Sequence, residues 1–272
     1  MNTVGKVITI TSGKGGVGKT TATANLGGGL AQLGKKVVLL DADIGLRNLD
    51  LVMGLENRIV FDLVDVVEEK CRSYKQALIK DKRFDTLFLI PASQSRDKES
   101  VSPDQMRDLC QQLREEFDYI IIDCPAGIEH GFKNAIAGAD EAIIVTTPEV
   151  SSVRDADRIV GLLEAEEKSN PKLIVNKVKM DMVKRGQMMT IEDVKEILNI
   201  ELLGIVPDDE FIVVSANRGE PAVMNPSSKA GAAYRWIVQR ITDPSMPIPG
   251  DNGNGNWFGK LRRFFSRERA AL

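Results

Sequence analysis

Short apolar runs recur along the chain, separated by stretches that are each long enough to form a helix. The runs are rich in Val, Ile and Leu and do not alternate with polar residues, which is typical of strands covered by helices on both faces. They lie at residues 7–10, 37–40, 87–90, 120–122, 143–145, 173–175 and 202–206. The pattern predicts an α/β fold with a doubly wound, mostly parallel sheet of about seven or eight strands and helices on both faces.

Polar and glycine-rich segments follow several of these runs. They occupy residues 13–21, 41–50, 123–129 and 147–155, directly after the first, second, fourth and fifth apolar runs. In doubly wound sheets, ligands bind outside the carboxyl ends of the strands. We therefore expect these four loops to meet at one edge of the sheet and to form a ligand site there.

The pattern changes beyond residue 242. Residues 243–256 contain three prolines and three glycines, and their apolar residues follow neither a helical nor a strand period. Such a segment cannot bury enough surface to offset the entropy lost on ordering. The sequence therefore predicts one folded domain over residues 1–242, a flexible linker over 243–256 and a separate terminal segment over 257–272.

The terminal segment has the pattern of a basic amphipathic helix. At ~100° per residue, its large apolar side chains fall within an arc of roughly 120° and basic side chains lie opposite. The apolar face consists of Trp257, Phe258, Leu261, Phe264 and Phe265, and the basic face of Lys260, Arg263 and Arg267. Helices of this composition lie at the boundary between lipid headgroups and acyl chains. We expect the segment to bind an anionic membrane surface, in preference to docking onto the protein's own core.

Charge agrees with an anionic partner for this segment. Residues 257–272 carry five basic side chains and one acidic one, a net charge of +4, whereas the whole chain carries −3. Nucleic acid is the other candidate polyanion, but a helix that binds phosphates does not need a continuous face of aromatic and leucine side chains. We therefore expect no specific nucleic-acid binding. One short helix holds a membrane weakly, and two helices on a dimer hold it much more strongly.

Composition narrows the chemistry further. The sequence contains no run of about 18 apolar residues and no signal-peptide pattern, so we expect neither a membrane span nor export. Three scattered cysteines are too few for a disulfide framework, which favours a reducing compartment. His130 is the only histidine, so the sequence offers almost no residues for a histidine-based triad or a zinc site. We expect this residue on the surface or at the start of a helix.

The first loop satisfies the phosphate-binding pattern G-x-x-x-x-G-K-[ST] at residues 13–20, GKGGVGKT. It lies between an apolar strand and a helix predicted over residues 21–33, which is the context that the motif requires. Glycines let backbone N–H groups face a phosphate, and the helix N-terminus adds positive potential. Lys19 is expected to neutralise phosphate oxygens during catalysis, and Thr20 to hold Mg²⁺. The motif predicts ATP binding by Gly13, Lys14, Gly15, Gly16, Val17, Gly18, Lys19, Thr20 and Thr21.

Carboxylates follow two of the other strands. The fourth apolar run ends in Asp123, the arrangement of a Walker B carboxylate beside Mg²⁺. A turn at residues 125–127 follows, and we expect Glu129 at the start of a helix near the nucleotide. Asp41 and Asp43 follow the second run and lie on one side of an extended backbone.

One carboxylate in the loop after the second run could simply cap that loop, but two near a γ-phosphate suggest chemistry. Hydrolysis needs a water molecule held in line with the bond that breaks, and little covalent help. We predict that Asp43 is catalytic, orients this water and belongs, with Thr20 and Asp123, to the metal site. Asp41 is predicted to contact the nucleotide site as a switch residue or as part of the metal shell.

Lys14 indicates a narrower group within the proteins that carry this phosphate-binding motif. The segment KGGVGKT at residues 14–20 resembles the signature KGGxGK[ST] of the deviant Walker A family, which includes MinD and ParA ATPases, arsenite-pump ATPases and nitrogenase iron protein. In that family this lysine crosses a dimer interface to the partner's nucleotide. The resemblance implies an ATP hydrolase that forms an ATP-dependent homodimer, with Lys14 as a catalytic residue rather than a solvated loop lysine.

Four further segments resemble the MinD branch of that family. They are residues 41–50 (DADIGLRNLD), 90–94 (IPASQ), 125–129 (PAGIE) and 148–158 (PEVSSVRDADR). The resemblance runs from about residue 3 to 242 and resumes in the terminal segment. It implies control of septum placement in bacterial division, in the cytoplasm and at the cytoplasmic face of the inner membrane.

The same resemblance implies partners and further contacts. A division inhibitor, MinC, and a regulator that stimulates hydrolysis, MinE, compete for one surface in that branch. The matching positions are Arg47, Asn48, Ser151, Val153, Arg154 and Asp155. Family counterparts of Asn176, Pro207 and Asp208 contact adenine, although ordinary turn chemistry explains these three residues nearly as well.

Other functions remain open at this point. A ParA-like partition ATPase is the main alternative, and it would bind DNA and ignore liposomes. An iron–sulfur carrier of the same family would need cysteines that bridge a dimer or a CxxC motif, and the sequence has neither. A flagellar-number regulator related to MinD would differ mainly in its partner.

Overall fold

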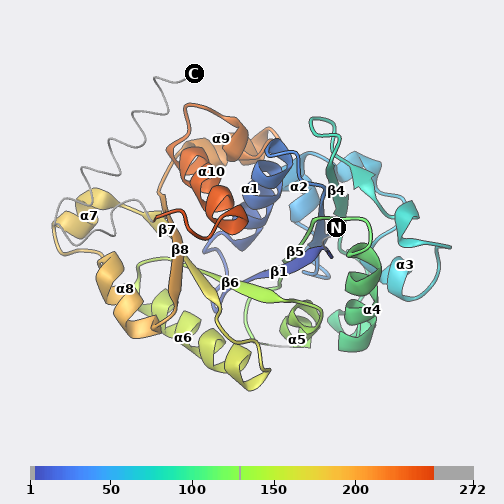
Figure 1. Ribbon diagram of the computed structural model, residues 1–272, viewed down its shortest axis with the longest axis horizontal. Coiled ribbons are helices and arrows are strands. Elements are labelled where there is room, and N and C mark those ends of the chain that lie inside the picture. The colour runs from blue at the N-terminus through green and yellow to red at the C-terminus, as the bar shows by residue number, and fades with distance from the viewer. Residues whose placement is uncertain (1–3, 129, 248–272) are drawn as a thin grey trace.

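One eight-stranded sheet organises the molecule. The computed structural model describes residues 4–128 and 130–247, and its strands lie in the order β3-β4-β2-β5-β1-β6-β7-β8 (Figure 1). The strands are β1 (Lys6–Thr11), β2 (Val37–Asp41), β3 (Ile79–Lys80), β4 (Leu87–Ile90), β5 (Tyr119–Asp123), β6 (Glu141–Thr146), β7 (Lys172–Val178) and β8 (Glu201–Pro207). All neighbouring strands are parallel except β3 and β4. The predicted doubly wound, mostly parallel sheet is confirmed. The additional strand, β3, was not predicted because two residues show no period.

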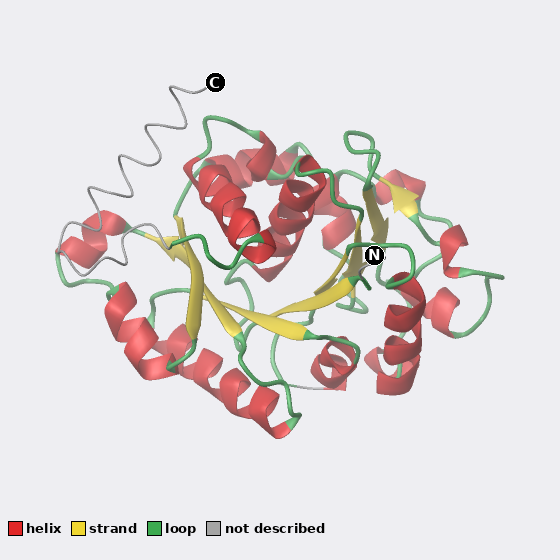
Figure 2. Cartoon of the chain, in the orientation of Figure 1, coloured by secondary structure: helices red, strands yellow, loops and turns green. Residues whose placement is uncertain are grey.

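Helices cover both faces of the sheet (Figure 2). The helices are α1 (Lys19–Gln32), α2 (Leu49–Met53), α3 (Leu63–Val67), α4 (Pro103–Leu113), α5 (His130–Ala137), α6 (Val150–Ala165), α7 (Met180–Lys184), α8 (Ile191–Leu198), α9 (Phe211–Asn217) and α10 (Lys229–Thr242). Short 3₁₀ turns occur at η1 (Glu56–Arg58), η2 (Tyr74–Gln76), η3 (Lys98–Ser100) and η4 (Ala222–Met224). α1, α2, α9 and α10 lie on one face, and α4, α5, α6 and α8 on the other (Figure 1). In the part of the chain that the structure describes, no helix has both the length and the apolar character needed to cross a membrane.

Two hydrophobic cores explain why the strands are apolar without alternation. Ile120 and Ile122 of β5 belong to a core shared with α4, α5 and α6. Ile121, between them, belongs to the core on the other face, which is shared with α1 and α10. Because successive side chains of a strand point to opposite faces, both sets must be apolar when both faces are covered.

Glycines let α1 approach the sheet closely. A Cβ atom on Gly27 would lie 2.5 Å from Cδ2 of Leu39 in β2, and one on Gly29 would lie 2.8 Å from Cγ2 of Val238 in α10. Larger residues at these positions would push the helix outward. α1 begins at the loop after β1, so this packing fixes the place of the phosphate-binding motif over the central strands.

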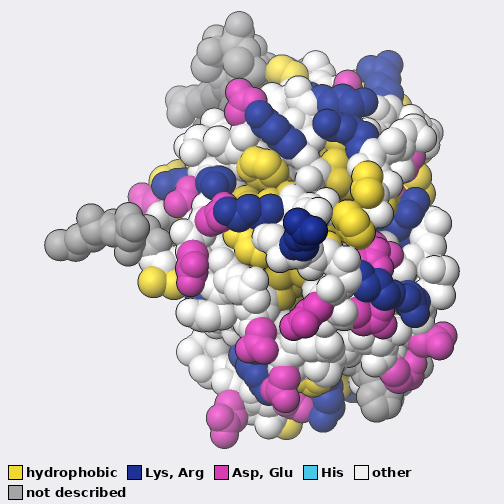
Figure 3. Space-filling model, turned by 90° about the vertical axis from the view of Figure 1, so that its right-hand side faces the viewer, with side chains coloured by type: hydrophobic (Ala, Val, Ile, Leu, Met, Phe, Trp, Pro, Cys, Tyr) yellow, Lys and Arg dark blue, Asp and Glu magenta, His cyan; other side chains and the backbone are white. Residues whose placement is uncertain are grey.

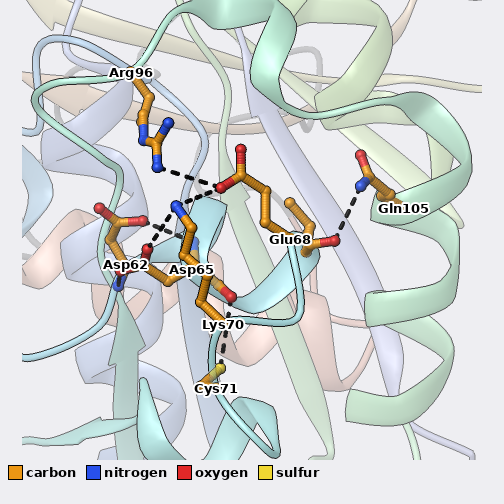
Figure 4. A network of polar contacts seen from close by, with 8 residues as sticks. Asp62, Asp65, Glu68, Lys70, Cys71, Arg96 and Gln105 are labelled. Carbon is orange, nitrogen blue, oxygen red and sulfur yellow. Dashed lines mark hydrogen bonds and ion pairs between the residues drawn. The ribbon is translucent and has the colours of Figure 1, made fainter.

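The region around α3 is held by a polar network (Figure 4). Asp62 caps the helix in a reciprocal capping box with Asp65. The side chain of Lys70 pairs with Asp65 at 3.6 Å and with Glu68 at 2.5 Å. Arg96 pairs with Glu68, and Gln105 of α4 donates to the carbonyl oxygen of Val67. The network therefore joins the end of α3 to the loop after β4 and to α4.

The outer face at the β3 and β4 edge carries charges of both signs. Acidic and basic side chains are interspersed there around a group of hydrophobic ones (Figure 3).

The folded part closes with α10. Arg240 in its last turn donates from Nε to the carbonyl oxygen of Met246 at 3.0 Å and from Nη1 to the carbonyl oxygens of Leu202 and Leu203. These bonds hold the start of the predicted linker against β8. The rest of that linker, from residue 248, and the predicted membrane helix over 257–272 lie outside the described residues.

Candidate functional site

The loop between β1 and α1 is built for a phosphate. Gly16 and Gly18 have positive φ angles of 77° and 102°, which turn the backbone before α1 begins at Lys19. Gly18 is the N-cap and provides no side-chain acceptor for the first N–H groups of the helix. Free N–H groups at a helix N-terminus attract an anion. The predicted phosphate loop therefore has the backbone shape that such a site requires.

The glycines of this loop have two different roles. A Cβ atom on Gly13 would lie 2.1 Å from the carbonyl oxygen of Asp155 in α6, and one on Gly18 would lie 2.3 Å from Nδ2 of Asn176. Close packing therefore requires glycine at both positions. A Cβ atom on Gly15 or Gly16 would meet no atom within 4 Å. The backbone at these two residues faces open space, where a ligand has room.

Lys14 extends from the loop to the start of α6. Its Nζ atom donates to Oγ of Ser151 at 3.0 Å and lies 3.8 Å from Oε2 of Glu149. The Lys14 side chain is 42% exposed. Gly13 contacts the same helix at Asp155, so two consecutive loop residues bind α6 directly. A movement of Lys14 would therefore break contacts at the first turn of α6.

Asp123 lies beneath the loop, at the end of β5. Its carboxylate accepts a hydrogen bond from Oγ1 of Thr23 at 3.2 Å and another from Thr20. Burial raises the pKa of Asp123 to about 6, an effect that the two threonine bonds and the positive charge of Lys19 partly offset. Lys19 is itself buried. The structure thus brings a hydroxyl, a carboxylate and an ammonium group together behind the loop.

Asp41 and Asp43 have separate positions. Asp41 is fully buried, and its two oxygens accept the N–H groups of Asp43 at 3.0 Å and Leu49 at 3.2 Å. Burial, followed by the nearby charge of Asp123, raises the pKa of Asp41 well above its usual range. Asp43 lines the open cleft. Asp41 therefore holds both ends of the loop over residues 41–50, and its predicted contact with the nucleotide site stays a prediction.

The remainder of the 41–50 loop contains a strained residue. Arg47 has a φ angle of 46°, which is unusual for a residue with a side chain. Its Nε atom lies 3.1 Å from Oδ2 of Asp50, whose side chain is fully buried. Burial raises the pKa of Asp50, and the Arg47 charge opposes that effect. Arg47, predicted on a partner surface, thus has a half-buried side chain that pairs within the loop.

The other predicted partner residues differ in exposure. Asn48, Ser151 and Arg154 are exposed, and Asp155 is half-buried. Val153 is 1% exposed and belongs to the hydrophobic core beneath α6. The prediction of Val153 on a partner surface is therefore wrong. It came from a continuous segment of resemblance, whereas a helix exposes only one side of such a segment.

Asn176 and Lys177 support the loop from the end of β7. Asn176 is buried, and its Nδ2 atom donates to the carbonyl oxygen of Val17 at 2.8 Å. Lys177 has a positive φ of 55°, and its Nζ atom donates to the carbonyl oxygen of Gly16 at 2.7 Å. Sequence reasoning did not identify Lys177, because nothing in the residues 176–178 indicates a lysine directed back onto a loop far away in the chain. Both side chains act on the backbone of the phosphate loop.

These elements surround one large cleft of about 1510 Å³. The predicted residues that line it are Gly15, Gly16, Gly18, Lys19, Thr20, Thr21, Asp43, Asn48, Asn176, Pro207 and Asp208. Exposed hydrophobic residues form part of the wall, and they are Leu46, Leu51, Val150 and Val213. Gly13, Lys14, Val17, Asp41 and Asp123 lie outside this lining, and Glu129 is not among the described residues. The predicted convergence of loops at the carboxyl ends of the strands is found at this cleft.

The donor atoms near the loop fit a small, hard cation. Thr20 and Asp123 provide neighbouring oxygens, and the charge of Asp43 adds to the effects that raise the pKa of Asp123. Among residues 4–128 and 130–247, no three His, Cys, Asp or Glu side chains converge into a metal cage of their own. Mg²⁺ is usually held by one or two protein oxygens, with water and substrate phosphates as its other ligands. The residues present therefore fit Mg²⁺ bound together with a nucleotide.

Comparison with known families agrees with this chemistry. A family model described as the CobQ/CobB/MinD/ParA nucleotide binding domain matches residues 8–222. The septum site-determining protein MinD of Bacillus subtilis (strain 168) is 56% identical over 265 residues, which cover 96% of this chain and 98% of that protein. The matched ranges include the phosphate loop, the 41–50 loop and residues 176 and 207–208.

Two solved structures are similar throughout the fold. A chain in the MinC:MinD cell division protein complex of Aquifex aeolicus has a TM-score of 0.81 and 51% identity, and the match covers 89% of this chain and 98% of that chain. The septum site-determining protein MinD of Pyrococcus horikoshii OT3, solved as a complex with Mg-ADP, has a TM-score of 0.79 and 28% identity. That match covers 88% of this chain and 97% of the other.

Proposed function

The chain belongs to the CobQ/CobB/MinD/ParA family of nucleotide-binding proteins, within its group of septum site-determining MinD ATPases, and we propose that it acts as an ATP-dependent homodimer on a membrane. ATP binding makes the dimer, the dimer makes membrane binding durable, and hydrolysis releases both. The contacts of Lys14 carry this proposal, because they connect the phosphate loop to the start of α6 at the rim of the cleft.

ATP is proposed to bind with its phosphates over Gly15 and Gly16, where the backbone faces open space. Lys19 neutralises the phosphate oxygens that gain charge as the terminal bond breaks. Thr20 and Asp123 hold Mg²⁺, which neutralises charge on the phosphates when it is bound. Asp43 lines the cleft and orients the attacking water. The division of work between these side chains follows the usual pattern of phosphoryl transfer, in which positioning and electrostatics dominate.

The rim of the cleft supports the dimer proposal. Leu46, Leu51, Val150 and Val213 expose from half to two-thirds of their area at its mouth. Exposed apolar groups of this kind are typical of surfaces that another protein covers. A second copy of the chain would cover them and close the cleft. Lys14, 42% exposed, would then exchange Ser151 for the nucleotide of the partner.

This exchange would also affect the predicted partner surface. Ser151 is released when Lys14 leaves, at the same first turn of α6 that precedes the exposed Arg154. The similar Aquifex aeolicus chain was solved in a MinC:MinD complex. We propose that a MinC-like division inhibitor binds Asn48, Ser151 and Arg154 in the ATP-bound dimer. A MinE-like activator is proposed to compete for the same surface and to stimulate hydrolysis.

The membrane part of the proposal rests on the sequence of residues 257–272. Its apolar and basic faces predict reversible binding to anionic lipid, with each basic residue contributing on the order of 1 kcal/mol near the surface. Two such segments on one dimer bind far more tightly than one. The proposed location is therefore the cytoplasm and, with ATP, the cytoplasmic face of the inner membrane.

Sedimentation with anionic liposomes tests the proposal. The full chain is compared with a chain that ends at Asn256, each with ATP, ADP or no nucleotide. We expect the full chain to pellet with the liposomes only when ATP is present. The shortened chain should stay in solution under all three conditions. Pelleting that survives removal of residues 257–272 would exclude the membrane helix. Retention on DNA with ATP, together with indifference to liposomes, would support a ParA-like partition function instead.

A further inference from the structure

Arg83 connects three segments that are far apart in the sequence. It lies between β3 and β4, where its guanidinium forms a double hydrogen bond with Asp81, at 3.0 Å from Nε and 2.6 Å from Nη2. Nη1 donates to the carbonyl oxygen of Gly219 at 2.6 Å, and Nη2 donates to the carbonyl oxygen of Met53 at 2.8 Å. Asp81 is buried, and the Arg83 side chain is 20% exposed. The planar guanidinium can hold all these acceptors at once, which a lysine cannot do.

The two carbonyl groups belong to the ends of two helices. Met53 is the last residue of α2, and Gly219 follows the end of α9. Carbonyl groups at a helix C-terminus lack partners within the helix and carry partial negative charge, so a cation is favourable there. Arg83 therefore neutralises two helix ends together, while Asp81 supplies its counter-charge.

The backbones of these two ends are in direct contact. Gly54 and Gly219 have positive φ angles of 65° and 64°. A Cβ atom on Gly219 would lie 2.5 Å from Cα of Gly54, and one on Gly54 would lie 2.9 Å from the carbonyl oxygen of Gly219. Glycine at both positions lets the helix ends touch, and Arg83 binds across the contact. We call Asp81, Arg83, Gly54 and Gly219 the clasp.

Both helices that meet at the clasp are walls of the nucleotide cleft. Leu51 and Val52 line it from α2, and Ile212 and Val213 line it from α9. α2 has five residues and a length of about 7.5 Å. Its first N–H group is bonded to Asp41 at the end of β2. The clasp thus ties the phosphate-side loop over residues 41–50 to the wall that follows Asp208.

We propose that Arg83 is a positioning residue that sets the separation of these two walls and thereby the affinity for nucleotide. Arg83 is not among the residues that line the cleft, so it acts through α2 and α9. This role rests on the proposed binding of nucleotide in the cleft. Without the clasp, the 41–50 loop and α9 move independently, and bound nucleotide must order them at a cost in affinity.

Titration of fluorescently labelled ADP with Mg²⁺ tests this role without the contribution of dimerisation. Arg83→Gln is expected to raise the Kd for ADP by roughly 3- to 30-fold, the range of mutations that alter coupling without touching the ligand. Arg83→Lys keeps the charge, and its Kd for ADP is expected to lie between the values of Arg83→Gln and of the original chain. Arg58→Gln is the matched control, because Arg58 is exposed and donates to the carbonyl oxygen of Lys80 in the neighbouring strand. It should change the Kd by less than about twofold.

A glycine pair provides a second route that leaves Arg83 intact. Gly219→Ala forces the helix ends apart, whereas Gly34→Ala introduces the same strain, at a φ of 75°, where no atom lies within 4 Å. Only Gly219→Ala should weaken ADP binding. If the clasp had only a structural role, these substitutions would lower the melting temperature and leave the Kd of the folded protein for ADP unchanged. An Arg83→Gln or Gly219→Ala variant with the original Kd would overturn the proposal. An original chain that binds no ADP would overturn the nucleotide site itself.

Discussion

Asp123→Asn tests whether the carboxylate proposed to hold Mg²⁺ lowers the stability of the protein when no nucleotide is bound. Asp123 is 1% exposed, and burial raises its pKa from 3.8 to about 6. A shift of this size means that ionised Asp123 costs the folded state ~3 kcal/mol. Asparagine has nearly the same shape and carries no charge. The variant should therefore be more stable than the original chain wherever Asp123 is ionised.

The sign of the pH dependence follows from the direction of the shift. Because the pKa is higher in the folded than in the unfolded state, the folded state binds the proton more tightly. The stability due to protonated Asp123 is fully present below pH 3.8 and is lost as the pH rises through about 6. The variant and the original chain should thus melt at nearly the same temperature at pH 4. At pH 8 the variant should melt up to roughly 6–12 °C higher.

Thermal melting without nucleotide at pH 4 and pH 8 measures this difference. Asp50→Asn is the control, because its carboxylate is also buried but lies 3.1 Å from Nε of Arg47. Burial raises the pKa of Asp50 against the opposing charge of Arg47, so ionised Asp50 also costs the folded state, and this variant should gain less stability at pH 8 than Asp123→Asn does. With Mg-ADP, Asp123→Asn should gain less stability than the original chain does. An Asp123→Asn variant that melts lower at both pH values by the same amount would refute the reasoning.

Four other variants separate the roles of the loops. Asp43→Ala should keep ATP-dependent association and slow hydrolysis by at least about 10²-fold, measured as phosphate release; unchanged turnover would mean that another group orients the water. Lys14→Ala should bind ADP normally but remain a monomer with ATP in light scattering, and an ATP-dependent dimer would contradict the exchange of contacts proposed for Lys14. Gly13→Ala places a Cβ atom 2.1 Å from the carbonyl oxygen of Asp155 and should cost about 1–3 kcal/mol in thermal unfolding. Gly15→Ala, with open space, should change stability far less while weakening nucleotide binding, and equal losses of stability would exclude the distinction.

Patterns formed by residues close together in the sequence were sufficient to predict the sheet and the phosphate loop. The apolar runs identified seven of the eight strands, because burial on both faces requires apolar residues at consecutive positions. The motif at residues 13–20 identified the loop, because glycines and a following helix produce the same backbone shape in any fold. β3 was missed because two residues carry no periodic signal. Val153 was misplaced because a run of resemblance does not distinguish the two sides of α6.

Contacts between distant segments could only be decided by the tertiary structure. Lys14 reaches Ser151, 137 positions along the chain, and Arg83 reaches Gly219 across 136 positions. Hydrogen bonds and ion pairs depend on distances of a few ångströms, and residue types alone do not specify such distances. The chemistry of the cleft was therefore determined by local sequence. The packing of helices on the sheet decided how the walls of the cleft are joined, through Lys177, Asp41 and the clasp.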